Sequence, residues 1–168
     1  MKKKLFSLFL FIIIHFTFNG RTAHIKGQLL DYITVIKISS TGQFVATALS
    51  NNQLQIRKVS TTNIVRTLTG HIANLSVLAW NSDDSRLAVG SSRYNETTTH
   101  AESIVYIYDV SSGQLLLTSP TQLGAIYDIA WDSTETKIIS GTEEIDGGEL
   151  RVIPLDAAIL SERIGGPG

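Results

Sequence analysis

Short apolar runs of four to seven residues alternate with polar turns along most of the chain after residue 32. No window carries apolar residues at helical spacing for long, and each run is short enough for a single strand. Ser, Thr, Asn, Asp and Gly fill the segments between the runs, which is the composition of tight turns between antiparallel strands. The pattern therefore predicts an all-β fold.

The predicted strands fall into three groups of four. Their expected bounds are Ile33–Ile38, Phe44–Ala48, Leu54–Val59 and Ile64–Leu68; then Leu75–Trp80, Leu87–Gly90, Ile104–Val110 and Leu115–Ser119; then Ile126–Trp131, Lys137–Gly141, Glu149–Ile153 and Ile159–Ile164.

One hairpin pattern recurs three times. Residues 38–47, 80–89 and 131–140 align without a gap, each with a bulky apolar residue, a polar turn and an apolar start to the next strand. The first residues of the three segments, Ile38, Trp80 and Trp131, are 42 and 51 residues apart. A period of about 40 to 45 residues with four strands per unit is typical of WD40 repeats.

Several motifs then resemble the WD40 propeller family in the right order. Thr69-Gly70-His71 is similar to the Gly-His pair that opens a repeat, and Tyr108-Asp109 resembles the Trp-Asp pair that ends a strand. The resemblance implies a partial β-propeller of about three four-stranded antiparallel blades, at about 32–69, 70–120 and 121–166. It assigns structural roles in the repeats to Gly70, His71, Trp80, Tyr108, Asp109 and Trp131. We expect Trp80 and Trp131 to pack in the core rather than to stack on a ligand.

The repeats also depart from the family pattern. Well-formed repeats of the family share a buried chain of hydrogen bonds among His, Ser or Thr, Asp and Trp, and no repeat here has the full set. The second repeat keeps His71 but has Val89 at the hydroxyl position and Tyr108 at the indole position. The third has Gln122 where His is expected. We expect a broken network and blades that depend mainly on apolar packing.

Three blades are too few for a closed ring, since propellers usually have 4 to 8. We expect a fragment of a longer propeller in preference to copies of the chain that assemble into a ring. An open arc with two exposed sheet faces is the third alternative.

The first 22 residues differ from the rest. Lys2, Lys3 and Lys4 precede a nearly unbroken apolar run from Leu5 to Phe18, which is the order of a secretory signal peptide. We predict a signal peptide or signal anchor at 1–22 and the repeats at 23–168, which places the protein outside the cytoplasm. The alternatives are a membrane anchor formed by this segment alone, or a cytoplasmic protein if the segment is not a signal.

The second repeat carries an insertion between its second and third strands. It spans residues 93–103, adds 9 residues relative to the first repeat, and mixes aromatic, polar and charged side chains. Insertions on one face of a repeat array often form the binding face, although a tolerated surface excursion is the favoured explanation of the segment, because long loops cost little stability. The candidate partner-binding loop consists of Arg93, Tyr94, Asn95, His100 and Glu102. Asn74 and Asn95 also fit the glycosylation acceptor pattern.

Charge and candidate chemistry narrow the function further. The formal net charge is -1 and cysteine is absent, so neither nucleic acid nor a thiolate metal site is expected. The four histidines are scattered, and the pairs Asp83-Asp84 and Glu143-Glu144 fit solvated turns better than an acid-base or calcium site. We therefore predict no catalytic residues, no metal and no cofactor.

The predicted function is a non-catalytic protein-interaction scaffold, with protein partners and with membrane contact only through the N-terminal segment. Two alternatives remain. The chain is either the N-terminal piece of a larger propeller whose ligand-binding or enzymatic site lies in further blades, or a poorly folding remnant with no present function.

Overall fold

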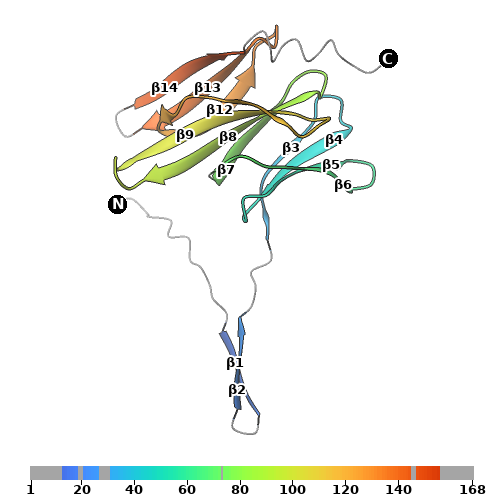
Figure 1. The fold of residues 1–168 in the computed structure, drawn as a ribbon, viewed down its shortest axis with the longest axis vertical. Coiled ribbons are helices and arrows are strands. Elements are labelled where there is room, and N and C mark those ends of the chain that lie inside the picture. Colours follow the sequence, from blue (N-terminus) through green and yellow to red (C-terminus); the bar gives the residue numbers. More distant parts are fainter. Residues whose placement is uncertain (1–12, 19–20, 27–30, 73, 145–146, 156–168) are drawn as a thin grey trace. The chain divides into compact units, whose positions relative to one another are not determined.

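The structure is a computed structural model, and it describes residues 13–18, 21–26, 31–72, 74–144 and 147–155 (Figure 1). The chain divides into two units, residues 1–31 and 32–168. In the first unit, β1 (Ile13–Phe18) pairs antiparallel with β2 (Arg21–Lys26). Among the described residues, no helix is long and apolar enough to cross a membrane. The signal function of residues 1–22 stays a prediction.

The second unit consists of antiparallel strands in three sheets, which we call blades. Blade one contains β3 (Ile33–Ile38), β4 (Phe44–Leu49), β5 (Leu54–Lys58) and β6 (Ile64–Leu68). Blade two contains β7 (Asn74–Trp80), β8 (Arg86–Asn95), β9 (His100–Asp109) and β10 (Leu115–Thr118), with the short β11 (Gln122–Leu123) also paired to β9. Blade three contains β12 (Ala125–Trp131), β13 (Lys137–Glu144) and β14 (Gly147–Pro154).

These strands confirm the predicted all-β fold and most of the predicted strand positions. The aligned residues Ile38, Trp80 and Trp131 each end the first strand of a blade. The strand predicted at 159–164 lies outside the described residues. The short β11 was not predicted, because two residues are too few to show a period in the sequence.

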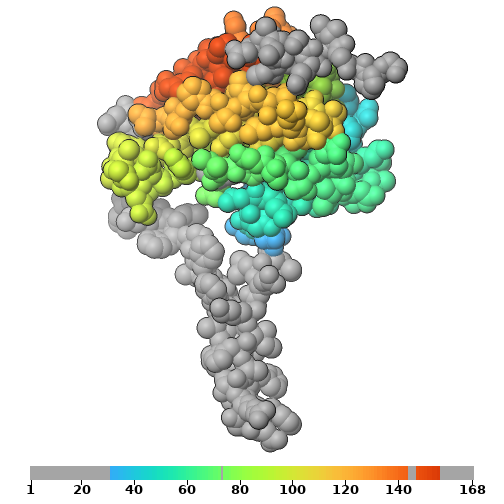
Figure 2. Space-filling view, viewed as in Figure 1, coloured from blue at the N-terminus to red at the C-terminus, as the bar shows by residue number. Residues whose placement is uncertain are grey.

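The core lies between the blades. One cluster joins blades one and two through Ala46, Leu54 and Ile56 against Leu78 and Leu87. A second joins blades two and three, with Ala88, Val105 and Ile107 against Ile129 and Ile138. Tyr106 and Tyr108 of β9 are also buried. Figure 2 shows blade one, in blue to cyan, and blade three, in orange to red, on opposite sides of blade two.

Two tryptophans join neighbouring blades by the same hydrogen bond. The indole Nε1–H of Trp80 donates to the Lys37 carbonyl oxygen at 3.0 Å, and that of Trp131 donates to the Ala79 carbonyl oxygen at 3.0 Å. Trp80 is 8% exposed and stacks on Phe44 with 6.5 Å between ring centroids. The structure thus confirms that Trp80 is a core residue, and it adds a polar role that burial of the indole requires.

Carboxylates form a second link between blades, which the sequence reading missed. Asp84 accepts hydrogen bonds from the Thr41 backbone N–H at 3.2 Å and from the Thr41 hydroxyl. Glu135 accepts from the Ser82 backbone N–H at 2.7 Å and from Asn81 Nδ2 at 3.1 Å. The prediction that the Asp83-Asp84 pair is a solvated turn is wrong for Asp84, which is buried because the turn of blade one covers it.

Asp84 and Glu135 occupy equivalent turn positions with left-handed backbone angles. Their φ values are 61° and 54°, and the equivalent residue of blade one is Gly42 at 75°. Aspartate adopts this conformation more readily than most residues, whereas a glutamate there is uncommon. The hydrogen bonds to the preceding blade offset the strain of that backbone.

The predicted loss of the family's hydrogen-bond network is only partly correct. His71 Nδ1 lies 3.2 Å from the Tyr108 hydroxyl, and His71 Nε2 lies 2.6 Å from the Asn52 carbonyl oxygen of blade one. A carbonyl oxygen only accepts, so His71 Nε2 donates to Asn52, and in the neutral ring this leaves Nδ1 to accept from the Tyr108 hydroxyl. In blade three the Ser140 hydroxyl donates to Gln122 Oε1 at 2.8 Å. Tyrosine and glutamine therefore keep a pairwise contact where the full set is absent.

Candidate binding site

The predicted irregular loop in blade two is a regular hairpin. β8 and β9 stay paired from Arg86 opposite Asp109 to Asn95 opposite His100, and the turn between them spans residues 96–99. The expectation of a loop is wrong because the inserted residues extend the two strands equally, and the added backbone groups pair with each other. We call residues 93–102 the ribbon. It forms the extended ends of β8 and β9 in Figure 1.

Three of the five predicted loop residues bind one another across the ribbon. The Arg93 guanidinium donates to Glu102 Oε2 at 3.0 Å, and Asn95 Nδ2 donates to Glu102 Oε1 at 2.6 Å. These bonds hold the pKa of Glu102 below its usual value, and the bond from Asn95 has the largest effect. Arg93, Asn95 and Glu102 thus hold the ribbon together and set its shape.

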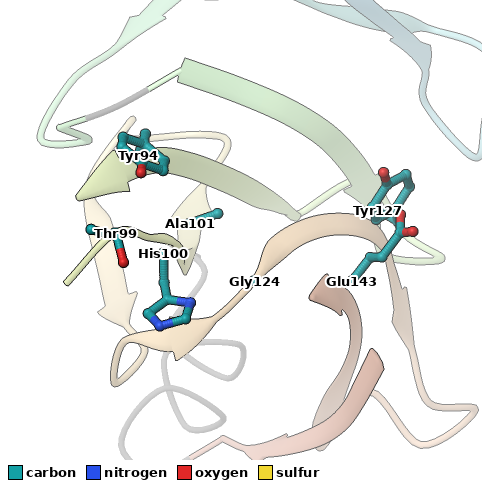
Figure 3. Close-up of a pocket in the computed structure, with 7 residues that line it drawn as sticks. All are labelled: Tyr94, Thr99, His100, Ala101, Gly124, Tyr127 and Glu143. Carbon is teal, nitrogen blue, oxygen red and sulfur yellow. The ribbon is translucent and has the colours of Figure 1, made fainter. Parts of the chain in front are cut away.

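The other two predicted residues, Tyr94 and His100, line a hollow beside the ribbon (Figure 3). The hollow has a volume of about 370 Å³, and its remaining walls come from the Thr99 turn and from Tyr127 and Glu143 of blade three. Tyr94 and Tyr127 are each 66% exposed. Strands from two blades therefore form this site, and two phenol rings lie open to solvent on it.

The side of the hollow in blade three is ordered by a polar contact. A hydrogen bond between the Tyr127 hydroxyl and the Glu143 carboxylate raises the pKa of Tyr127, and the charge of Glu143 acts in the same direction. At neutral pH the phenol is therefore protonated and donates to the carboxylate. The chemical groups on this wall are a hydrogen-bonded phenol, a carboxylate with a remaining acceptor oxygen, and an exposed aromatic face.

Sequence reasoning did not find Tyr127, and its prediction that Glu143 belongs to a solvated turn is wrong, because Glu143 lies in β13 and lines the hollow. Tyr127 lies at a β-bulge, since the register of β12 against β13 shifts between Ile126 and Asp128. The bulge places one extra residue in β12 and interrupts the alternation that strand patterns rely on. The sequence did hold a signal for the bulge. Ile126 and Ile129 are three residues apart, so the apolar residues around Tyr127 do not follow the period of two that a regular strand shows.

A second hollow of about 450 Å³ lies between blades one and two. Phe44, Val65 and Val110 contribute apolar walls, and Arg66 and Asp84 contribute charge. Arg66 Nε donates to the Ser111 carbonyl oxygen at 2.9 Å, and Asp84 binds Thr41. Arg66 and Asp84 are thus used in holding the blades together, and Asp83, which also lines the hollow, accepts from Asn81 and Ser85 of its own turn. This favours the ribbon hollow as the candidate site.

The remaining predicted repeat positions are structural. Gly70 has a φ of +97°, and a Cβ atom there would lie 3.1 Å from Leu115 Cδ2. Asp109 accepts from the Ser112 backbone N–H at 2.6 Å and from the Ser111 hydroxyl at 2.7 Å. Burial opposes ionisation of Asp109, but these bonds outweigh it and lower its pKa. Burial raises the pKa of Tyr108.

Within the described ranges, no three His, Asp or Glu side chains come together in a way that could hold a metal ion. Across the ribbon hollow the structure brings together one imidazole, one carboxylate and two phenols, from His100, Glu143, Tyr94 and Tyr127. These groups suit recognition of polar and aromatic side chains.

Comparison with known proteins agrees with this architecture. Residues 62–109 match the family model described as WD domain, G-beta repeat. Solved structures with a similar fold include the computationally designed Ika4 protein, at 15% sequence identity and a TM-score of 0.58, over 82% of this chain and 74% of that chain. No curated protein matches the sequence significantly. Residues 62–109 are therefore similar to a WD40 repeat, and the second unit has the fold of a partial β-propeller.

Proposed function

We propose that the chain is a non-catalytic scaffold that binds a protein partner at the ribbon hollow. The observation that carries the proposal is the pair Tyr94 and Tyr127, two largely exposed phenols that face a hollow between blades two and three. Tyrosine is enriched at protein interfaces because it offers a large contact area and a hydrogen bond at low conformational cost.

The ribbon suits this role because its shape is set before binding. Backbone pairing continues to the Asn95–His100 pair, and Glu102 binds both Arg93 and Asn95. A partner that binds a preformed surface orders fewer side chains on association. WD40 repeats typically mediate protein–protein contacts, which supports the same class of function.

A photo-crosslinking amino acid in place of Tyr94 or Tyr127 tests the proposal in cells of the source organism. The matched control carries the crosslinker at Val59, an exposed apolar residue in the β5–β6 turn. We expect one protein to be crosslinked from both tyrosine positions and not from Val59. The purified partner should bind the wild-type chain, and the double variant Tyr94→Ala/Tyr127→Ala should bind at least tenfold more weakly. Equal crosslinking from all three positions would overturn the proposal.

We also propose that residues 1–22 direct export, so that the repeats act in a secreted or extracytoplasmic protein, with a membrane anchor as the alternative outcome. The order of charge and apolar residues supports this. Intact mass of the chain recovered from outside the cell tests it. Loss of an N-terminal segment indicates a signal peptide, retention in the membrane fraction indicates an anchor, and recovery of the full chain from the cytoplasm overturns export.

A second proposal is that the chain forms part of a larger ring that further blades complete. The exposed apolar side of blade three supports this proposal. Leu150 and Val152 are exposed there, whereas the equivalent residues of the other two blades are buried. In such a ring, a ligand-binding or enzymatic site would lie in blades beyond these three.

A further inference from the structure

One side of blade three repeats a surface that the fold has already buried twice. This side, which we call the acceptor face, comprises Ala130 in β12, Ile139 and Gly141 in β13, and Leu150 and Val152 in β14. Ala130 is paired with Ile139, Ile139 with Val152, and Gly141 with Leu150. Leu150 is 71% exposed and Val152 is 50% exposed. The face includes a shallow hollow of about 120 Å³.

The equivalent residues of blades one and two are covered by the next blade. In blade two they are Ala79, Ala88, Gly90, Ile107 and Val105, and Ala88, Ile107 and Val105 are fully buried against blade three. In blade one Ala46, Ala48, Ile56 and Leu54 are fully buried against blade two. The acceptor face therefore resembles two interfaces that the structure establishes, except at Asp128, which lines its hollow where the other blades have Val77 and Val35.

Both covering blades bring the same two polar groups. Blade two supplies the Trp80 indole and the Asp84 carboxylate, and blade three supplies Trp131 and Glu135. The receiving groups recur in blade three. The Ala130 carbonyl stands where those of Lys37 and Ala79 stand, and the exposed Ser133 stands where Ser82 stands. Thr134 stands where Thr41 stands, and its backbone N–H and hydroxyl donate to Asp132 of the same turn.

A second copy of the chain lacks these groups. Its blade one carries Ile38 at the indole position and Gly42 at the carboxylate position. The outer side of that blade is also occupied by polar contacts, because Arg57 donates to Gln55 Oε1 at 2.7 Å and to the Thr62 carbonyl oxygen at 3.0 Å.

We propose that the acceptor face binds a further four-stranded blade that presents an indole N–H and a carboxylate at the positions of Ile38 and Gly42, and that a second copy of this chain is not that partner. The proposal rests on the ring completion proposed above and adds the chemistry that selects the blade. Apolar contact supplies the area of such an interface, and the two polar groups fix its register.

The test transfers the missing groups to blade one of the full chain, as the double variant Ile38→Trp/Gly42→Asp. Ile38 is 58% exposed, and aspartate adopts the left-handed backbone of Gly42 as Asp84 does. By sedimentation velocity the wild-type chain should be monomeric. The variant should self-associate at least tenfold more tightly, because its blade one can now cover the acceptor face of another copy.

Leu150→Asp in the double variant should abolish the association, whereas Ile72→Asp, at an exposed apolar residue outside the face, should not. If the double variant does not fold, the surface substitution Ile38→Trp alone carries the same test with a smaller gain. A folded variant that stays monomeric would overturn the proposal. A wild-type dimer that Leu150→Asp dissociates would also overturn the proposal, because it would show that the face does not require an indole and a carboxylate. It would still support ring completion, so failure of this proposal and failure of ring completion are distinguishable.

Discussion

The indole N–H of Trp131 donates to the carbonyl oxygen of Ala79 at 3.0 Å, across the junction between blades two and three. Trp80 makes the same bond to Lys37 across the previous junction. Both bonds join the first strand of one blade to the first strand of the blade before it. They fix how consecutive sheets align, since apolar packing alone tolerates small shifts.

Replacement of Trp131 by phenylalanine should lower the free energy of unfolding by about 1–3 kcal/mol. It removes one hydrogen bond, leaves the Ala79 carbonyl oxygen without that donor, and reduces the packed volume. Urea unfolding followed by circular dichroism measures the change. Tyr127→Phe, at an exposed position in the same strand, is the control and should change the midpoint little. An unchanged midpoint for Trp131→Phe would show that the bond adds nothing.

Asp84 should tolerate asparagine much better than alanine. Asparagine keeps an acceptor oxygen for Thr41 and adopts a positive φ readily. Alanine loses the acceptor and remains in a strained backbone, so we expect a loss of about 2–4 kcal/mol, against less than half of that for asparagine. Thermal or urea unfolding of both variants gives the comparison. Equal losses would mean that the negative charge, rather than the acceptor, carries the contribution.

Gly90 and Gly141 occupy the same position in blades two and three and should respond oppositely to alanine. A Cβ atom at Gly90 would lie 2.4 Å from Val77 Cγ1 and 3.1 Å from Ile126, so the packed junction must shift. We expect Gly90→Ala to cost about 1–3 kcal/mol. At Gly141 a Cβ atom meets nothing within 4 Å, and Gly141→Ala should be neutral or slightly stabilising. Urea midpoints of the two variants decide; a large loss at Gly141 would contradict the open face.

The protein should lose stability in acid partly through Asp109. The folded pKa of Asp109 is lowered by its bonds to Ser112 and Ser111, so its contribution is present above the ordinary aspartate pKa of about 3.9. That contribution is lost as pH falls below this value through the lower folded pKa, because the unfolded state binds the proton first. Unfolding midpoints measured from pH 7 to pH 3 should fall less steeply for Asp109→Asn. Parallel curves for the two proteins would exclude this cause.

The sequence predicts the strands well because each carries a local signal. The aligned hairpin residues fix the positions of Ile38, Trp80 and Trp131, and the turn residues between them are characteristic. Burial of Tyr106 and Tyr108 follows from their place in a strand with apolar neighbours. These features depend on residues close together in the chain.

What the sequence could not give depends on residues about 40 to 55 positions apart. Glu135 binds Ser82 and Asn81 of the preceding blade, and no local pattern marks that contact. The aligned turns held an indirect signal of these contacts. The carboxylates of Asp84 and Glu135 share a position with Gly42, and glycine is the residue that most readily adopts a left-handed backbone. The ribbon was missed because its polar residues resemble a loop, although Arg93 and Glu102 are opposite each other as a charged cross-strand pair.

The tryptophan and carboxylate links between the blades have one direction, because those of blades two and three each bind the blade that precedes them in the chain. During synthesis the N-terminal blade leaves the ribosome first, so each later blade emerges beside a finished template. Folding of the second unit can therefore proceed stepwise during translation, without waiting for residues still to be made. In a circular permutant that begins at blade two, blade one would be synthesised last, after the blade that binds it. This permutant should refold from denaturant as efficiently as the natural chain, but it should fold less efficiently on the ribosome.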